Sequence, residues 1–348
     1  MLYTRRDIGR IALAAGAVST LNAAKPNSVF GGVQIGTITY SFRELPSSAD
    51  EVLKYILDCG ISSIELMSNV AESYAGAPAQ GGRGGPGRGP GGPAAPGAPG
   101  GPGGPGGGQG RGRGGRQMTP EQQAAMQKAA AEMKDWRLSV SMDKYKAFRK
   151  MYNDAGVSIY AFKLPPTMSM SDQEYDYIWN VAETLGANHV TMELPTDDAL
   201  LQRVGEYAAK RKLRIAFHTH GQGGESGFQK ALAASPYTAL NLDVGHYYGV
   251  NGQSPVPVVV KYHDRIASLH LKDRKGPNAA GDDPGPGGGG PNMPWGQGET
   301  PLREVLQTMK KNNYKFPASI EYEYQTPEGS DVVSEVKKCV QYCKDALA

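Results

Sequence analysis

Short apolar runs and amphipathic helical segments alternate along most of this 348-residue chain. The apolar runs are rich in β-branched residues, as in buried strands, and each is followed by apolar positions at helical spacing. Eight strands are expected, at residues 33–40, 61–67, 157–164, 189–194, 213–218, 239–243, 266–271 and 318–322. Helices are expected at 47–57, 119–136, 144–155, 172–185, 197–212, 227–234, 256–263, 302–312 and 332–347. Strict alternation implies a parallel sheet, and eight units in about 300 residues predict an α/β fold, the closed (β/α)8 TIM barrel.

An open, doubly wound sheet is the alternative architecture for such a pattern. It would need a glycine-rich phosphate-binding turn after the first strand. Residues 36–41, with the sequence GTITYS, do not form such a turn. We therefore expect one barrel domain over residues 27–348.

The first 26 residues carry a different signal. The pair Arg5 and Arg6 precedes a short, weakly apolar run at 11–23, which resembles a twin-arginine export signal. We expect residues 1–26 to be a signal peptide that directs the folded chain to the periplasm or another extracytoplasmic space; an amphipathic first helix is the alternative. The run is too short to span a bilayer, so no stable membrane insertion is expected after cleavage.

Two stretches hold much of the glycine and proline of the chain. Residues 75–116 consist almost wholly of Gly, Pro, Arg, Ala and Gln, and residues 276–292 are similar. Such a composition buries too little apolar surface to offset the entropy of ordering. We expect 75–116 to be a disordered insertion after the second strand, an inert spacer or else a surface-binding arm, and 276–292 to be a flexible loop.

Charge and cysteine content exclude several functional classes. The formal net charge is +3, and no basic face interleaved with aromatic residues is visible, so nucleic-acid binding is not expected. Cys59, Cys339 and Cys343 have no metal-like spacing with histidines, and an odd count does not indicate a disulfide framework. We expect buried, unreactive thiols.

Polar residues gather at the ends of the last five expected strands. These residues are Glu193, His218, His220, Asp243, His246, His270, Lys272, Glu321 and Glu323. The active site of a (β/α)8 barrel lies at the carboxyl ends of its strands, and ionisable groups are costly to bury unless they are paired or bind a metal.

Mixed carboxylate and imidazole ligands suit Mn²⁺, Zn²⁺, Co²⁺ or Fe²⁺, and several carboxylates favour Mn²⁺ or Mg²⁺ over a structural zinc ion. We therefore expect one divalent ion, Mn²⁺ first among these. The predicted ligands are Glu193, Asp243, His270 and Glu321. For Glu65 and Glu323 a side chain at the barrel rim is the simpler interpretation, and His189 and His263 are expected to be structural.

Four motifs, in order, carry a family resemblance. They are Leu242-Asp-Val-Gly-His, Leu269-His-Leu-Lys-Asp, Gly296-Gln-Gly-Glu and Ile320-Glu-Tyr-Glu. Together they resemble the xylose-isomerase-like TIM barrels described as sugar phosphate isomerases/epimerases, over residues 33–345. The resemblance implies one divalent ion held by Glu, Asp, His and Glu from four strands, with Asp243, His270 and Glu321 as the last three ligands.

The first ligand departs from that pattern. Many epimerases of the family carry Glu at the end of strand five, where this chain has His218. Glu193, one strand earlier, is then the expected carboxylate ligand, and this arrangement looks more like the myo-inosose dehydratase branch. Endonuclease IV is a related enzyme, but its additional histidine ligands on strands two and three have no counterpart in this chain. DNA repair is therefore not expected.

The resemblance implies proton transfer next to the carbonyl of a sugar, with the ion acting as a Lewis acid. Candidate bases are Glu321, His218 and His246. Lys272 and Lys163 would stabilise negative charge. His220, Glu323 and Trp295 are expected to bind substrate.

We expect a sugar isomerase or epimerase that acts on a non-phosphorylated sugar or keto-sugar, because export argues against phosphorylated ones. A sugar dehydratase or keto-glycoside lyase on the same site is the alternative. A non-catalytic sugar-binding or scaffold barrel is the alternative of another class. Self-association into a homo-oligomer is also left open.

Overall fold

The computed structural model describes residues 25–79, 119–221, 224–279 and 288–348. The predicted signal peptide, apart from Lys25 and Pro26, lies outside these residues. So do residues 80–116 of the predicted insertion and the central part, 280–287, of the predicted flexible loop.

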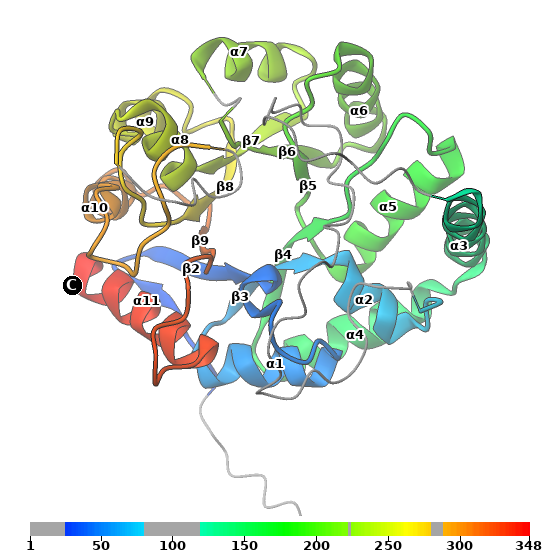
Figure 1. The fold of residues 1–348 in the computed structure, drawn as a ribbon, viewed down its shortest axis with the longest axis horizontal. Coiled ribbons are helices and arrows are strands. Elements are labelled where there is room, and N and C mark those ends of the chain that lie inside the picture. Colours follow the sequence, from blue (N-terminus) through cyan, green and yellow to red (C-terminus); the bar gives the residue numbers. More distant parts are fainter. Residues whose placement is uncertain (1–24, 80–118, 222–223, 280–287) are drawn as a thin grey trace, which may run out of the picture.

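Eight parallel strands form a closed ring, which confirms the predicted (β/α)8 barrel (Figure 1). They are β2 (Val33–Ile38), β3 (Ser63–Met67), β4 (Ser158–Lys163), β5 (His189–Glu193), β6 (Arg214–His218), β7 (Thr238–Asp243), β8 (Ile266–Leu271) and β9 (Ala318–Ile320). Pairing of β2 with β9 closes the ring, and the short strand β1 (Val29–Phe30) pairs antiparallel with β2. Closure removes the exposed sheet edges that would otherwise pair with other chains.

Helices surround the ring (Figure 1). They are α1 (Ala49–Asp58), α2 (Ser68–Ala75), α3 (Pro120–Ser139), α4 (Met142–Asp154), α5 (Asp172–Leu185), α6 (Asp198–Arg211), α7 (Glu225–Ala233), α8 (Val244–Asn251), α9 (Val256–Lys261), α10 (Leu302–Asn312) and α11 (Val332–Leu347). Local sequence sets several ends: Ser48 and Glu51 form a capping box at α1, and Gly186 closes α5 in the left-handed conformation. Among the described residues, no helix combines the length and apolar character that crossing a membrane requires.

Two α-helices in the described part of the chain were not expected from the sequence. The helix α2 has a weak apolar pattern and no side-chain cap at its start. The helix α8 begins directly after β7, where Asp243 accepts a hydrogen bond at 2.7 Å from the backbone N–H of His246. His246 is therefore helical and not in a loop, because Asp243 serves as an N-cap as well as a strand end. One expected helix is shorter than predicted. The helix at 256–263 was expected to include His263, but α9 ends at Lys261.

The apolar core lies between the ring and its helices, whereas the inside of the ring is partly polar. One continuous cluster of buried apolar residues joins strands to helices. Within the barrel, Ala216, Ala239 and Ala267 form a separate small cluster. Small side chains in this layer leave room for buried polar groups such as Glu65 and His189.

Candidate metal centre

Strand register brings the polar strand ends together. Glu193 on β5 is aligned with His218 on β6, and Asp243 on β7 is aligned with His270 on β8. Glu321 follows directly after β9, which pairs with β8. All of these residues lie at the carboxyl ends of their strands, as expected for the active face of a (β/α)8 barrel.

Four side chains converge closely enough to hold one metal ion. Ligand atoms of His218, Asp243, His270 and Glu321 all lie within 4.8 Å of one another, and all four residues are buried. The pair His270 Nδ1 and Glu321 Oε2 is 2.5 Å apart, and His218 Nε2 lies 3.8 Å from Asp243 Oδ2. Three of the four ligands predicted from the sequence are in this group, and His218, predicted as a base, is the fourth member.

The donor set fits a divalent cation. Asp243 Oδ2 and His218 Nδ1 are buried, and neither accepts a hydrogen bond within the described residues, although Asp243 Oδ2 forms an ion pair with Lys272 at 3.0 Å. Buried polar groups without partners are costly and call for an explanation such as a bound ion. Burial alone would raise the pKa of Glu321, but Lys272 and His270 outweigh it and hold that pKa well below its usual range. Two imidazoles and two carboxylates suit Mn²⁺, Fe²⁺, Co²⁺ or Zn²⁺.

Lys272 lies against the same carboxylates. Its ammonium is 3.0 Å from both Asp243 Oδ2 and Glu321 Oε2, and 2.8 Å from Glu323 Oε2. Its side chain is only 2% exposed. Burial by itself would lower the pKa of Lys272, but the three carboxylates raise it, so the side chain stays charged. The predicted anion-stabilising lysine and the predicted substrate-binding Glu323 are thus brought into the site.

A second group is made only of histidines. His218, His220 and His246 also offer ligand atoms within 4.8 Å of one another, and the rings of His220 and His246 stack with centroids 4.4 Å apart. His246 Nε2 lies 2.8 Å from Lys272 Nζ, and its Nδ1 lies 2.5 Å from Arg274 Nη1. Burial and the adjacent Lys272 lower the pKa of His246 well below its usual value. His246 is therefore a neutral imidazole at physiological pH.

Glu193 lies beside this centre and not in the four-residue group. Its Oε1 accepts a hydrogen bond from Lys163 Nζ at 2.9 Å, its Oε2 is 3.3 Å from His220 Nε2, and its side chain is 46% exposed. Coordination by Glu193 remains a prediction. The structure gives this residue a second role, in which it pairs with Lys163 and orients His220.

The match to a family model decides the family. A model described as xylose isomerase-like TIM barrel matches residues 124–342. The chain belongs to this family. The match covers the four-residue group and all strands from β4 to β9.

Individual relatives agree with this family. An inosose dehydratase from Clostridium botulinum is 28% identical over 158 residues, which are 42% of this chain and 52% of the relative, so the match spans about half the length of that protein. A xylose isomerase domain protein from Alicyclobacillus acidocaldarius superposes with a TM-score of 0.55 at 14% identity, covering 90% of this chain and 99% of that one. The 3-keto-D-glucoside 4-epimerase of E. coli superposes with a TM-score of 0.52 at 9% identity, covering 90% and 99%. At such low identity, the two superpositions show the shared fold.

One buried residue of this xylose isomerase-like barrel was undervalued from its sequence. Glu65 was interpreted as a rim side chain, yet it is fully buried and accepts a hydrogen bond at 2.7 Å from His270 Nε2. Burial would raise the pKa of Glu65, but His270, Lys163 and Thr191 outweigh it and lower the pKa to about 2. The available signal was a lone carboxylate within the apolar strand 61–67, the same pattern that identified the other strand ends.

The loop after β8 shows what the Gly296-Gln-Gly-Glu motif of the family does here. Asp273 accepts backbone hydrogen bonds from Gly296 and Gly298 at 2.8 and 2.9 Å. A side chain at Gly298 would collide with the Asp273 carboxylate, so this close approach requires glycine. The motif therefore fixes the loop that carries Trp295, whose ring packs edge-on against Tyr342 at 5.6 Å. A substrate contact by Trp295 remains a prediction.

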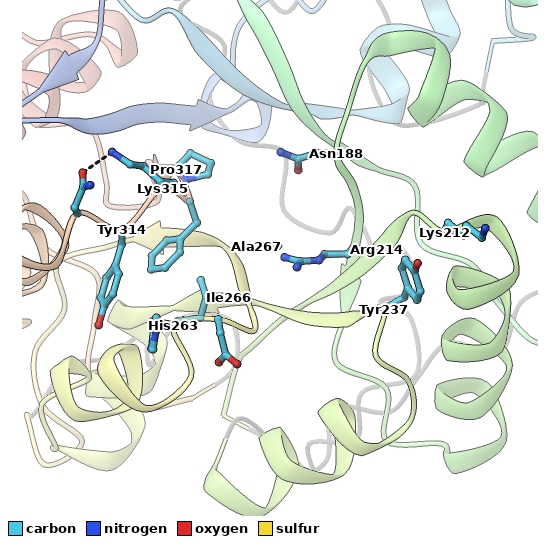
Figure 2. A pocket seen from close by; sticks show the side chains of 13 residues that line it. Asn188, Lys212, Arg214, Tyr237, His263, Ile266, Ala267, Tyr314, Lys315 and Pro317 are labelled. Carbon is cyan, nitrogen blue, oxygen red and sulfur yellow. Dashed lines mark hydrogen bonds between the residues drawn. The ribbon is translucent and has the colours of Figure 1, made fainter.

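A pocket of about 550 Å³ lies at the opposite end of the barrel (Figure 2). It is lined by residues at the amino-terminal ends of the strands, including Arg214, Ala267 and Pro317. None of the predicted site residues lines it. Since the amino-terminal face of such barrels serves stability and not catalysis, we place the function at the carboxyl face.

Proposed function

We propose that this chain is a divalent-metal-dependent sugar isomerase or epimerase that moves a proton next to a carbonyl. The observation that carries the proposal is the buried group His218, Asp243, His270 and Glu321 at the carboxyl face of the barrel. Membership of the xylose isomerase-like family supports it. We take the substrate to be a non-phosphorylated sugar or keto-sugar, as expected if the chain is exported by the twin-arginine route.

The four side chains would hold the ion, with Mn²⁺ first among the candidates and Zn²⁺, Co²⁺, Fe²⁺ and Mg²⁺ as alternatives. When bound, the ion supplies Lewis acidity toward a carbonyl oxygen and an adjacent hydroxyl oxygen. Glu321 donates a carboxylate to this set. Its lowered pKa keeps it ionised, as a metal ligand must be.

His246 is the candidate proton acceptor that lies outside the ligand group, although Lys272 and Arg274 face its two ring nitrogens and oppose its protonation. It is buried and uncharged, and it lies next to the group without belonging to it. The ammonium of Lys272, 2.8 Å from His246 Nε2, would stabilise the negative charge that develops on the substrate oxygen. Lys163 and Glu193 hold His220 at the open side of the site. Glu323, His220 and Trp295 would contact the sugar.

A dehydratase or lyase is the second candidate, because the relative with 28% identity is an inosose dehydratase. Both reactions begin with removal of a proton next to the carbonyl. Return of the proton to another position gives the isomer or epimer. Loss of a β-hydroxyl or glycosidic oxygen with its bonding electrons gives elimination instead.

Elemental analysis of the purified protein tests the proposal. We expect about one divalent ion per chain, and its loss in Asp243→Asn. Solvent-deuterium incorporation into keto-sugars and 3-keto-glycosides, followed by NMR, then separates proton exchange from elimination. A protein that takes up no ion even after incubation with Mn²⁺, Zn²⁺ or Co²⁺ would contradict the proposal and favour the non-catalytic sugar-binding or scaffold role.

A further inference from the structure

Glu65 connects four strands inside the barrel. It projects from β3 and accepts hydrogen bonds from Thr191 Oγ1 on β5 at 2.6 Å, Asn241 Nδ2 on β7 at 3.0 Å and His270 Nε2 on β8 at 2.7 Å. All four residues are fully buried. A buried carboxylate with three donors is well satisfied, so its negative charge is tolerated there.

Two irregularities in the sheet accompany this contact. The register between β3 and β4 shifts between Ile64 and Glu65, and the register between β7 and β8 shifts between Leu240 and Asn241. A local register shift re-aims the side chain beside it, and such shifts are frequent next to active sites. Glu65 and Asn241 each follow a shift, and they bond to each other across the barrel.

The chemistry of the contact determines where His270 carries its proton. An ionised carboxylate only accepts hydrogen bonds, so the ring nitrogen that faces Glu65 must be the donor. That nitrogen is Nε2. The other ring nitrogen, Nδ1, faces the ionised carboxylate of Glu321, toward the group that contains His218 and Asp243. Without an ion Nδ1 would donate to Glu321 in the same way, so an ion bound there would replace the Nδ1 proton and leave the proton on Nε2.

We propose that Glu65 is a positioning residue that keeps the proton of His270 on Nε2 and thereby makes Nδ1 the ligand atom. The part that concerns the ion rests on the proposed function. Without the carboxylate, the imidazole could turn about its Cβ–Cγ bond or exchange tautomers, and each change would move the lone pair away from Asp243 and Glu321. Outer partners that orient a ligating histidine in this way typically change metal affinity by about 10–100-fold.

Two variants of Glu65 test the proposal by removing different numbers of hydrogen-bond acceptors. Glu65→Leu keeps the volume of the side chain but removes every acceptor, whereas Glu65→Gln keeps one acceptor oxygen for His270 Nε2. We expect the Kd for Mn²⁺, measured by equilibrium dialysis on the full chain, to rise about 10–100-fold in Glu65→Leu and by less in Glu65→Gln. Equal Kd values in wild type and Glu65→Leu would overturn the proposal.

A second buried glutamate provides the matched control. Glu72 is buried and accepts hydrogen bonds from Arg137 and Tyr177, outside the candidate centre. Glu72→Gln should lower thermal stability as a Glu65 variant does, yet leave the Kd for Mn²⁺ unchanged. If Glu72→Gln weakens Mn²⁺ binding equally, the effect of Glu65 is general destabilisation and the proposal is wrong.

Imidazole ¹⁵N NMR gives a readout that a purely structural role would not move. In the Zn²⁺-loaded protein we expect Nε2 of His270 to carry a slowly exchanging proton and Nδ1 to be shifted by the metal. A protonated Nδ1 with a bare Nε2 would refute the assignment. If wild type binds neither Mn²⁺ nor Zn²⁺, the proposed function fails, while the protected Nε2–H resonance and its loss in Glu65→Leu still decide the role of Glu65.

Discussion

Lys272 Nζ lies 3.0 Å from Asp243 Oδ2, the buried oxygen that accepts no hydrogen bond within the described residues. The same ammonium contacts Glu321 at 3.0 Å and Glu323 at 2.8 Å. A lysine and the proposed divalent ion therefore share two carboxylates. We infer that the lysine lowers the affinity for the ion while it supplies positive charge to the reaction.

Lys272→Met should separate these two effects. Loss of a cation that competes for Asp243 and Glu321 should tighten Mn²⁺ binding by about tenfold, a modest part of the charge–charge energy available at this distance. Turnover should fall by about 100-fold or more, because charge stabilisation at the substrate oxygen is lost. Equilibrium dialysis and the deuterium-exchange assay measure the two quantities. Lys275→Met, at a half-exposed lysine on the same loop, is the control, and a weaker Mn²⁺ affinity in Lys272→Met would contradict the competition.

Glu193→Gln tests the ligand assignment made from the sequence. Because Glu193 is half-exposed and bonded to Lys163, we expect the variant to keep its metal and to lose less than ~1 kcal/mol of stability. KM for the substrate should rise, since His220 loses its carboxylate partner. Elemental analysis decides the point. Loss of the ion in Glu193→Gln would show that Glu193 coordinates it, as first predicted.

The fold was predictable because its signals are local. Periodicity, the capping pair Ser48 and Glu51, and glycine at helix ends each depend on a few neighbouring residues. The helix α8 escaped prediction because Asp243, interpreted as the end of a strand, also caps a helix.

The members of the site were predictable only in part. The strand-end pattern identified Asp243, His270 and Glu321, because parallel strands end at one face. The contact between Glu65 and His270 spans 205 positions along the chain and depends on a register shift at Glu65. Neither feature leaves a local trace in the sequence. Periodicity likewise does not encode how the ends of the strands turn. It therefore could not show that His218 lies in the four-residue group and that Glu193 lies beside it.

His218→Glu should change the preference among metal ions. It would give the centre three carboxylates and one imidazole in place of two of each. Carboxylates favour Mn²⁺ and Mg²⁺, whereas imidazole favours Zn²⁺. We expect the ratio of the Kd for Mn²⁺ to the Kd for Zn²⁺ to fall by about tenfold or more, measured by competition between the two ions. His263→Glu, at an exposed histidine outside the candidate centre, is the control. An unchanged ratio in His218→Glu would remove His218 from the set of ligands.

His189 should make the stability of the barrel depend on pH. It is fully buried beside Ser268, and burial, with a smaller contribution from Arg214, lowers its pKa to about 4 although Glu65 opposes the shift. An unfolded histidine titrates near 6.5, so between pH 6.5 and 4 the unfolded chain binds the extra proton. The stabilisation from neutral His189 is thus complete above pH 6.5 and is lost progressively as the pH falls toward 4.

Urea unfolding at pH 7 and pH 5 measures this loss. We expect wild type to lose roughly 2 kcal/mol more than His189→Gln between these two values. The glutamine variant is the matched comparison, because it keeps a buried polar side chain that does not titrate and every other ionisable group is common to both proteins. Equal losses in the two proteins would show that His189 is not held neutral by the fold.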